Sequence, residues 1–157
     1  MRYHLMGLAL AFGLAGPGLA QAAGSEVTEP VRQFIAAFNV GDLKAAEATH
    51  AADAIIIDEP PPFIWRGPGA FQAWLVDLAK DDAARGRTDG HVTLGEPKRE
   101  EVAGDAAYVI VPVDYAFKDR GVALHEPSQM TLSLRKTAAG WKITSWTWTG
   151  PRGVPVP

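Results

Sequence analysis

The 157-residue sequence contains no cysteine. Disulfide bonds, thiolate catalysis and thiolate metal sites are therefore excluded, and the hydrophobic core must hold the fold alone. An excess of basic residues is also lacking, because the formal net charge is −3, and this argues against a nucleic-acid partner. The hydrophobic share of 47% and the charged share of 21% are typical of one globular domain.

Long apolar runs are lacking except at the N-terminus. Met1–His4 supplies a short positive start, residues 5–14 are mostly apolar, and small residues allow cleavage after Ala20 or Ala22. This is the layout of a secretory signal peptide, and the run is short and glycine-broken for a membrane span. We expect residues 1–22 to be removed, which leaves a periplasmic or secreted protein with no stable membrane anchor. The alternative is an uncleaved N-terminal anchor.

Helix patterns occupy the first half of the remaining chain, after a short leader at residues 23–27. Two segments place apolar residues at i, i+3, i+4 and i+7, namely Val31, Phe34, Ile35 and Phe38 and then Phe71, Trp74, Leu75 and Leu78. Between them, Asp42 is suited to cap a short helix. The polar residues 81–90 are expected to form an exposed loop.

Strand patterns dominate the second half. Strands are expected at residues 53–58, 91–99, 106–117, 129–135 and 141–149. The first contains three consecutive isoleucines, which indicates burial on both faces. Residues 91–99 are expected to pair with 106–117 across a turn near Gly104, and Pro112 predicts a bulge. The proline-rich tail, residues 151–157, has little reason to fold. Helices on one side of an antiparallel sheet make an α+β fold.

This element order, together with several local sequences, resembles the NTF2-like superfamily and its SnoaL-like branch. The sequences that carry the resemblance are Phe34–Asp42, Ala51–Asp58, Trp65–Gly67 and Gly140–Ile143. The resemblance implies a cystatin-like cone over residues 28–150, with three N-terminal helices packed on a curved antiparallel or mixed sheet. It implies no single activity, because this fold hosts isomerases, cyclases, dehydratases and binding modules.

Asp58 is the candidate catalytic residue. The resemblance is sharpest to the ketosteroid isomerases, whose base is an aspartate at this position, and burial would raise the pKa of such a carboxyl toward the working pH. The isomerases also need two oxyanion donors, and these positions fall on Phe34 and near Met130, which cannot donate. Losing one such donor costs about 3 kcal/mol of barrier, so ketosteroid isomerase activity is not expected. The alternative role for Asp58 is to cap the turn that begins at Glu59.

Aromatic residues suggest a ligand cavity. Trp146 and Trp148 have the same parity on the last strand, so they face one side of the sheet. The predicted ligand-binding residues are Phe34, Trp65, Tyr115, Met130, Trp146 and Trp148. The alternative is that these rings simply fill the cone. His50, His91 and His125 show no metal-ligand spacing, so each is expected on the surface or in a loop, and neither a metal nor a cofactor is predicted.

Three hypotheses follow. The leading one is an exported protein that binds a small apolar or aromatic molecule. The second is a cofactor-free isomerase, dehydratase or cyclase that uses Asp58 as general base. The third is a homodimeric interaction module, in which the mixed, modestly polar outer sheet face of Thr131, Ser133, Ser145 and Thr147 packs against a second copy.

Overall fold

The computed structural model describes residues 25–156, so the expected signal peptide lies outside the described residues. The helices are α1 (Glu29–Asn39), α2 (Leu43–Ala48) and α3 (Ala70–Arg85). The strands are β1 (His50–Ile57), β2 (Ile64–Arg66), β3 (Arg87–Leu94), β4 (Arg99–Ala103), β5 (Ala106–Asp119), β6 (Val122–Thr137), β7 (Gly140–Thr149) and β8 (Val154–Pro155). Within residues 25–156, no helix is long and apolar enough to cross a membrane.

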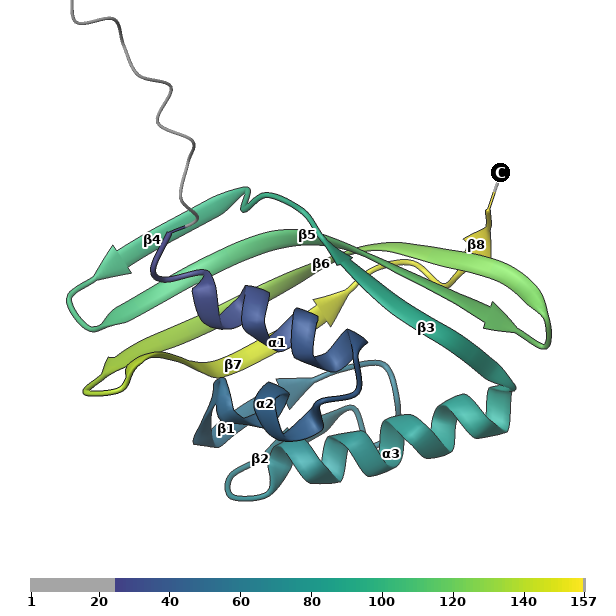
Figure 1. Cartoon of the computed structure of the whole chain (residues 1–157), viewed down its shortest axis with the longest axis horizontal. Coiled ribbons are helices and arrows are strands. Elements are labelled where there is room, and N and C mark those ends of the chain that lie inside the picture. The colour runs from purple at the N-terminus through teal and green to yellow at the C-terminus, as the bar shows by residue number, and fades with distance from the viewer. Residues whose placement is uncertain (1–24, 157) are drawn as a thin grey trace, which may run out of the picture.

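One curved, mixed sheet forms the body of the molecule. Its order is β2-β1-β7-β6-β5-β3, with β4 added to β5 and β8 added to β6. β1 runs parallel to β7, and the other pairs are antiparallel. Figure 1 shows the three helices gathered on one face of this sheet. The predicted α+β fold, with three N-terminal helices packed on a curved mixed sheet, is therefore confirmed.

The helices begin and end for local reasons. Pro30 occupies the first turn of α1, where its missing N–H costs nothing, and the Asp42 side chain accepts the Ala45 N–H at 3.0 Å to cap α2. α3 ends at Gly86, which has a φ of 73° and so takes a left-handed conformation that favours glycine.

The core is an aromatic cluster between the helices and β7. Trp146 and Trp74 meet edge to face, with ring centroids 5.1 Å apart. Phe34 lies 5.9 Å from Trp146, and Phe71 lies 5.4 Å from Trp74. Each such pair contributes about 0.5–1.5 kcal/mol beyond its area burial, so this cluster holds α1 and α3 onto the sheet.

Three sequence expectations about local structure are wrong. The segment 81–90 is no loop, because α3 continues to Arg85 and β3 begins at Arg87. The first strand is buried on one face only, since Ile56 is fully buried while Ile55 and Ile57 are 38% and 40% exposed. The segment expected as one strand at 91–99 is split: β4 pairs across the turn at residue 104, while β3 pairs with the far half of β5.

The proline-containing segments also differ from expectation. β5 and β6 pair without a register shift through Pro112, so the predicted bulge is absent from that ladder. The break between β3 and β4 lies beside Pro112 instead, where its carbonyl accepts the Gly95 N–H at 2.9 Å. In the tail, Val154 pairs with His125 of β6, so the expectation that the tail does not fold is wrong for β8.

Candidate functional site

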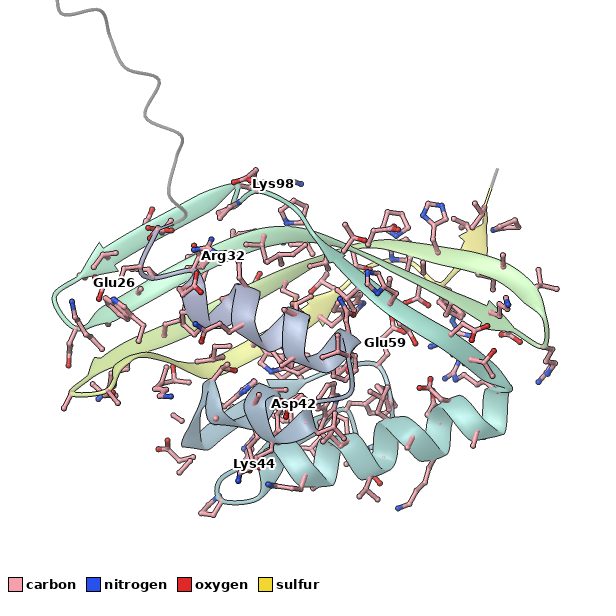
Figure 2. All side chains as sticks on the ribbon, in the orientation of Figure 1. Glu26, Arg32, Asp42, Lys44, Glu59 and Lys98 are labelled. Carbon is pink, nitrogen blue, oxygen red and sulfur yellow. The ribbon has the colours of Figure 1, made fainter. Side chains whose placement is uncertain are left out.

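A cavity of about 380 Å³ lies between the helices and the inner face of the sheet. This size is within the range of small-molecule sites. Much of its wall is apolar and comes from α1, α3, β6 and β7, including Phe34, Phe38, Trp74, Met130, Trp146 and Trp148. Polar side chains line the rest, including Asp58, Glu59, Asp82, Arg87, Tyr115 and Glu126. Figure 2 labels Glu59, one of these lining residues, on the loop after β1.

The structure brings most of the predicted site residues to this one cavity. The residues that line it are Asp58, Phe34, Tyr115, Met130, Trp146 and Trp148. Their roles in binding or catalysis stay predictions. Trp65 is elsewhere: it is buried among the core residues, and its Nε1 donates to Asp77 Oδ2 at 3.0 Å. The indole that α3 contributes to the cavity is Trp74.

Asp58 follows the last residue of β1 and is held by two donors. Trp74 Nε1 donates to Asp58 Oδ2 at 2.7 Å, and the Glu59 N–H donates to Oδ1 at 2.8 Å. Burial raises the pKa of Asp58 to about 6, against the lowering effect of these two hydrogen bonds. The turn-capping contact and the cavity position therefore coexist, and the result is a carboxylate more basic than an exposed one.

His50 is a buried residue, so the expectation of a surface or loop position is wrong for it. Trp146 Nε1 donates to His50 Nε2 at 3.0 Å. Because an indole N–H only donates, Nε2 carries no proton, and Nδ1–H donates to the Ala46 carbonyl at 3.1 Å. Burial lowers the pKa of His50 to about 4. The neutral imidazole therefore fixes the orientation of a tryptophan in the cavity wall.

An ion pair in the cavity wall was missed by sequence reasoning. Arg87 Nη2 lies 3.3 Å from Glu126 Oε1, with side chains only 10% and 2% exposed. The Arg87 guanidinium also stacks over Phe117 at 4.5 Å from the ring centroid. Burial is the main reason that the pKa of Glu126 rises to about 7, with Glu59 adding to the rise and Arg87 opposing it.

A signal for Glu126 did exist in the sequence. Glu126 has the same parity as Met130, so extending the expected strand toward the N-terminus would have placed it on the inner face. Arg87 had no comparable signal, because it was assigned to a loop.

Tyr115 is positioned by a bulge in the neighbouring strand. The β3–β5 register shifts between Thr88 and His91, and Asp89 has a φ of 57°. A Cβ on Gly90 would lie 2.6 Å from the Tyr115 hydroxyl oxygen, so only glycine leaves room for this hydroxyl. Burial raises the pKa of Tyr115 to about 12, which keeps the hydroxyl protonated and able to donate.

Asp82 completes the polar wall on the α3 side. Its Oδ1 is buried and has no hydrogen-bond partner among residues 25–156. Burial raises the pKa of this carboxyl, while the charge of Arg87 opposes the rise. Among the same residues, no group of three or more His, Asp or Glu side chains is arranged to hold a metal ion. The cavity thus combines an aromatic wall with carboxyl groups, the Arg87 guanidinium and the hydroxyl groups of Thr88 and Tyr115.

Comparison with known proteins gives the family. A family model for the SnoaL-like domain matches residues 27–148, so the chain belongs to the SnoaL-like domain family. The comparison with curated proteins returned no match.

Solved structures agree on the fold. An NTF2-like superfamily protein from Salmonella enterica serovar Typhimurium is 18% identical, with a TM-score of 0.65 over 83% of this chain and 92% of that one. A ketosteroid isomerase-like protein from Erwinia carotovora atroseptica is 19% identical, with a TM-score of 0.61 over 79% and 92%. A hexachlorocyclohexane dehydrochlorinase, LinA type 2, is 13% identical, with a TM-score of 0.68 over 84% and 87%. At these identities the likeness concerns the fold alone.

Proposed function

We propose that this protein binds a small, largely apolar molecule, with an aromatic ring or a fused ring system, in the cavity between its helices and its sheet. The observation that carries the proposal is the cavity itself: about 380 Å³ of space remains beside a cluster of closely packed aromatic rings. Apolar walls with a few polar groups are typical of small-molecule sites. Trp148, which is only partly buried, supplies a flat surface on which a ring can stack.

Calorimetric titration with tetralin, a neutral hydrocarbon of two fused rings, tests this proposal. Trp148→Leu removes one ring from the wall and should weaken binding about fivefold to thirtyfold, the effect of losing roughly 1–2 kcal/mol of contact. Trp65→Phe is the matched control, because Trp65 does not line the cavity, and its affinity should equal that of the wild type. Absence of tetralin binding, or equal losses in both variants, contradicts the proposal. If tetralin binds as expected, mass spectrometry of small molecules released from the denatured protein would identify the natural ligand.

A second candidate function is a cofactor-free isomerase, dehydratase or cyclase in which Asp58 is the general base. It is favoured by the position of this carboxyl in the cavity and by its pKa of about 6. A base with a pKa near the working pH is protonated and deprotonated readily during turnover. Both carboxylate oxygens already accept a hydrogen bond, which holds the group in a fixed orientation. The remaining lone pairs are available to a substrate proton.

Hydrogen–deuterium exchange of 2-tetralone, followed by NMR in D₂O, tests the base without the natural substrate. This ketone carries an activated C–H between its ring and its carbonyl group. The wild type should accelerate exchange at that carbon above the rate in buffer, and Asp58→Asn should abolish the acceleration. Asp53→Asn, at an exposed position on the same strand, should leave it intact. Exchange that persists in Asp58→Asn rules out this role.

Two further features of the proposed function concern location and assembly. We propose that the protein acts outside the cytoplasm, on the basis of its N-terminal sequence. We also propose a homodimer through the outer sheet face, where Thr131 pairs with Thr147 and Ser133 with Ser145, so that adjacent strands present uncharged side chains. Light scattering tests the dimer: a monomer mass at high protein concentration contradicts it.

A further inference from the structure

Arg87 is a charged side chain with unused hydrogen-bonding capacity in the cavity wall. It is only 10% exposed, and a guanidinium carries five N–H groups. Only Nη2 has a side-chain partner among residues 25–156, namely Glu126. Nε is buried with no partner in that part of the chain. Nη1 also has no partner in that part of the chain, and it is not buried as Nε is, so it is the donor of Arg87 that an oxygen atom in the cavity can reach.

The surroundings of Arg87 hold the guanidinium in place. Glu126 binds one edge of the group, and Phe117 stacks against its face at 4.5 Å. Arg87 is also the first residue of β3, and its backbone is paired with Asp119 of β5. A donor that is already oriented loses little entropy when it binds a ligand. The arrangement is therefore that of a fixed donor in the wall, not of a mobile surface arginine.

The charges around Arg87 define which acceptors the site would accept. Glu126 already pairs with it, and Asp82 and Asp58 line the same cavity. A second carboxylate brought in by a ligand would face these groups and be repelled. An uncharged oxygen, as in a carbonyl or a hydroxyl group, accepts a hydrogen bond from the guanidinium without this repulsion.

We propose that Arg87 is a ligand-binding residue that donates a hydrogen bond to an uncharged oxygen of the bound molecule. This inference rests on the proposed function, since it requires that a molecule occupy the cavity. The bound molecule would place one carbonyl or hydroxyl oxygen at Arg87 and its apolar body against Trp148. Phe34 on α1 and Met130 on β6 offer no donor to such an oxygen, whereas Arg87 offers one from β3.

Calorimetric titrations with four matched probes test the inference: tetralin, 2-tetralone, 2-tetralol and 1,2,3,4-tetrahydro-2-naphthoate. The quantity to compare is the dissociation constant of tetralin divided by that of 2-tetralone. A substitution that changes the shape of the cavity affects both constants alike, so its effect cancels in this ratio. The wild type should bind the ketone about tenfold more tightly, the ratio expected of a hydrogen bond from a charged donor. The carboxylate should bind more weakly than the ketone. Titration with 2-tetralol, which offers a hydroxyl oxygen, shows which of the two groups the site prefers.

Two variants test the contribution of Arg87 to binding separately from that of Glu126. Arg87→Met combined with Glu126→Gln removes both charges together, which avoids leaving one buried charge unpaired, and should reduce the ratio to about one. Glu126→Gln alone keeps the guanidinium and should keep the preference for the ketone. Arg99→Met combined with Glu101→Gln is the matched control, because this pair is 55% and 61% exposed on β4, and it should behave as the wild type.

The outcomes test separately whether the cavity binds a ligand and whether Arg87 donates a hydrogen bond to it. If tetralin binds but the ratio is the same in the wild type and the Arg87 double variant, the cavity binds a ligand and the inference about Arg87 is wrong. If the carboxylate binds most tightly, the inference of an uncharged oxygen is wrong. If none of the probes binds, the proposed function fails and the inference fails with it.

Discussion

Replacing Asp58 by asparagine should change the stability of the protein in a pH-dependent way. The free energy of unfolding of the variant minus that of the wild type should be larger at alkaline pH than in acid. The reason is that the fold raises the pKa of this carboxyl to about 6 from an ordinary value of 3.8. Burial opposes the charged form, so the ionised carboxylate costs stability in the folded state. Asparagine has nearly the same shape and never ionises.

The magnitude and its sign follow from proton linkage. Below about pH 3.8, the carboxyl is protonated in both the folded and the unfolded chain and the charge has no effect. Between about pH 3.8 and 6, the folded chain binds more protons than the unfolded chain, so wild-type stability falls as pH rises. Above about pH 6, the full cost is present, and a shift of this size corresponds to up to about 3 kcal/mol.

Asparagine also changes the hydrogen bonds, and this effect must be separated from the charge. Asp58 accepts from Trp74 on one oxygen and from the Glu59 N–H on the other. An asparagine has only one acceptor oxygen, so its amide group meets an N–H donor on one side, which costs about 1–3 kcal/mol. This cost does not depend on pH. The difference between the variant and the wild type should therefore move in favour of the variant from pH 4 to pH 8.

Urea denaturation from pH 4 to pH 8 measures this difference, and Asp53→Asn serves as the exposed control on the same strand. The free energy of unfolding of Asp58→Asn minus that of the wild type should rise by up to about 3 kcal/mol across this range. The same difference for the control should stay flat. A difference that stays flat, or falls with pH, for Asp58→Asn would show that the fold does not penalise the Asp58 carboxylate, and the argument for a raised pKa would be refuted.

Three further outcomes are expected. Gly90→Ala places a Cβ 2.6 Å from the Tyr115 hydroxyl oxygen, so thermal denaturation should show a lower melting temperature, which Tyr115→Phe in the same chain should partly restore. Burial lowers the pKa of His50 from 6.5 to about 4, so the unfolded chain binds this proton more readily than the folded chain. The free energy of unfolding should therefore fall as pH drops from about 6.5 to 4. In urea titrations, His50→Gln should remove this part of the pH dependence. Trp65→Phe should cost about 1 kcal/mol in urea denaturation through its lost hydrogen bond.

Much of the fold could be predicted from the sequence because its strongest patterns are periodic. The apolar spacing of Val31, Phe34 and Ile35 predicted α1, and all three side chains are buried. Residues 129–135 were expected to form a strand, and their alternating apolar residues Met130, Leu132 and Leu134 are also buried in β6. In both segments one face packs against the core and the other faces solvent, so the apolar residues recur at a regular spacing in the sequence.

The segment from residue 81 to residue 90 was mispredicted because its structure depends on partners elsewhere. The end of α3 carries polar side chains, yet it contains good helix formers and no breaker before Gly86. β3 is mostly exposed and polar, and it becomes a strand because β5 supplies its hydrogen-bond ladder. Tertiary pairing of this kind overrides local composition. The same error hid Arg87, since a charged residue in an expected loop gives no sign of burial.

The carboxyl groups that line the cavity lower the stability of the fold, and this cost bears on the proposed function. Burial raises the pKa of Asp58, Asp82 and Glu126 alike, so at neutral pH each of these groups lowers the stability of the fold in proportion to its charge. Stability alone does not favour an ionised carboxyl group at these positions, because an apolar residue in the same place would avoid the cost. For Glu126, the structural explanation is its pairing with Arg87. That pairing would suffice if the guanidinium had its other donors satisfied, but Nε has no partner among the described residues. Costly carboxyl groups and an unsatisfied donor around one cavity support the proposal that the cavity binds a polar-ended, largely apolar molecule.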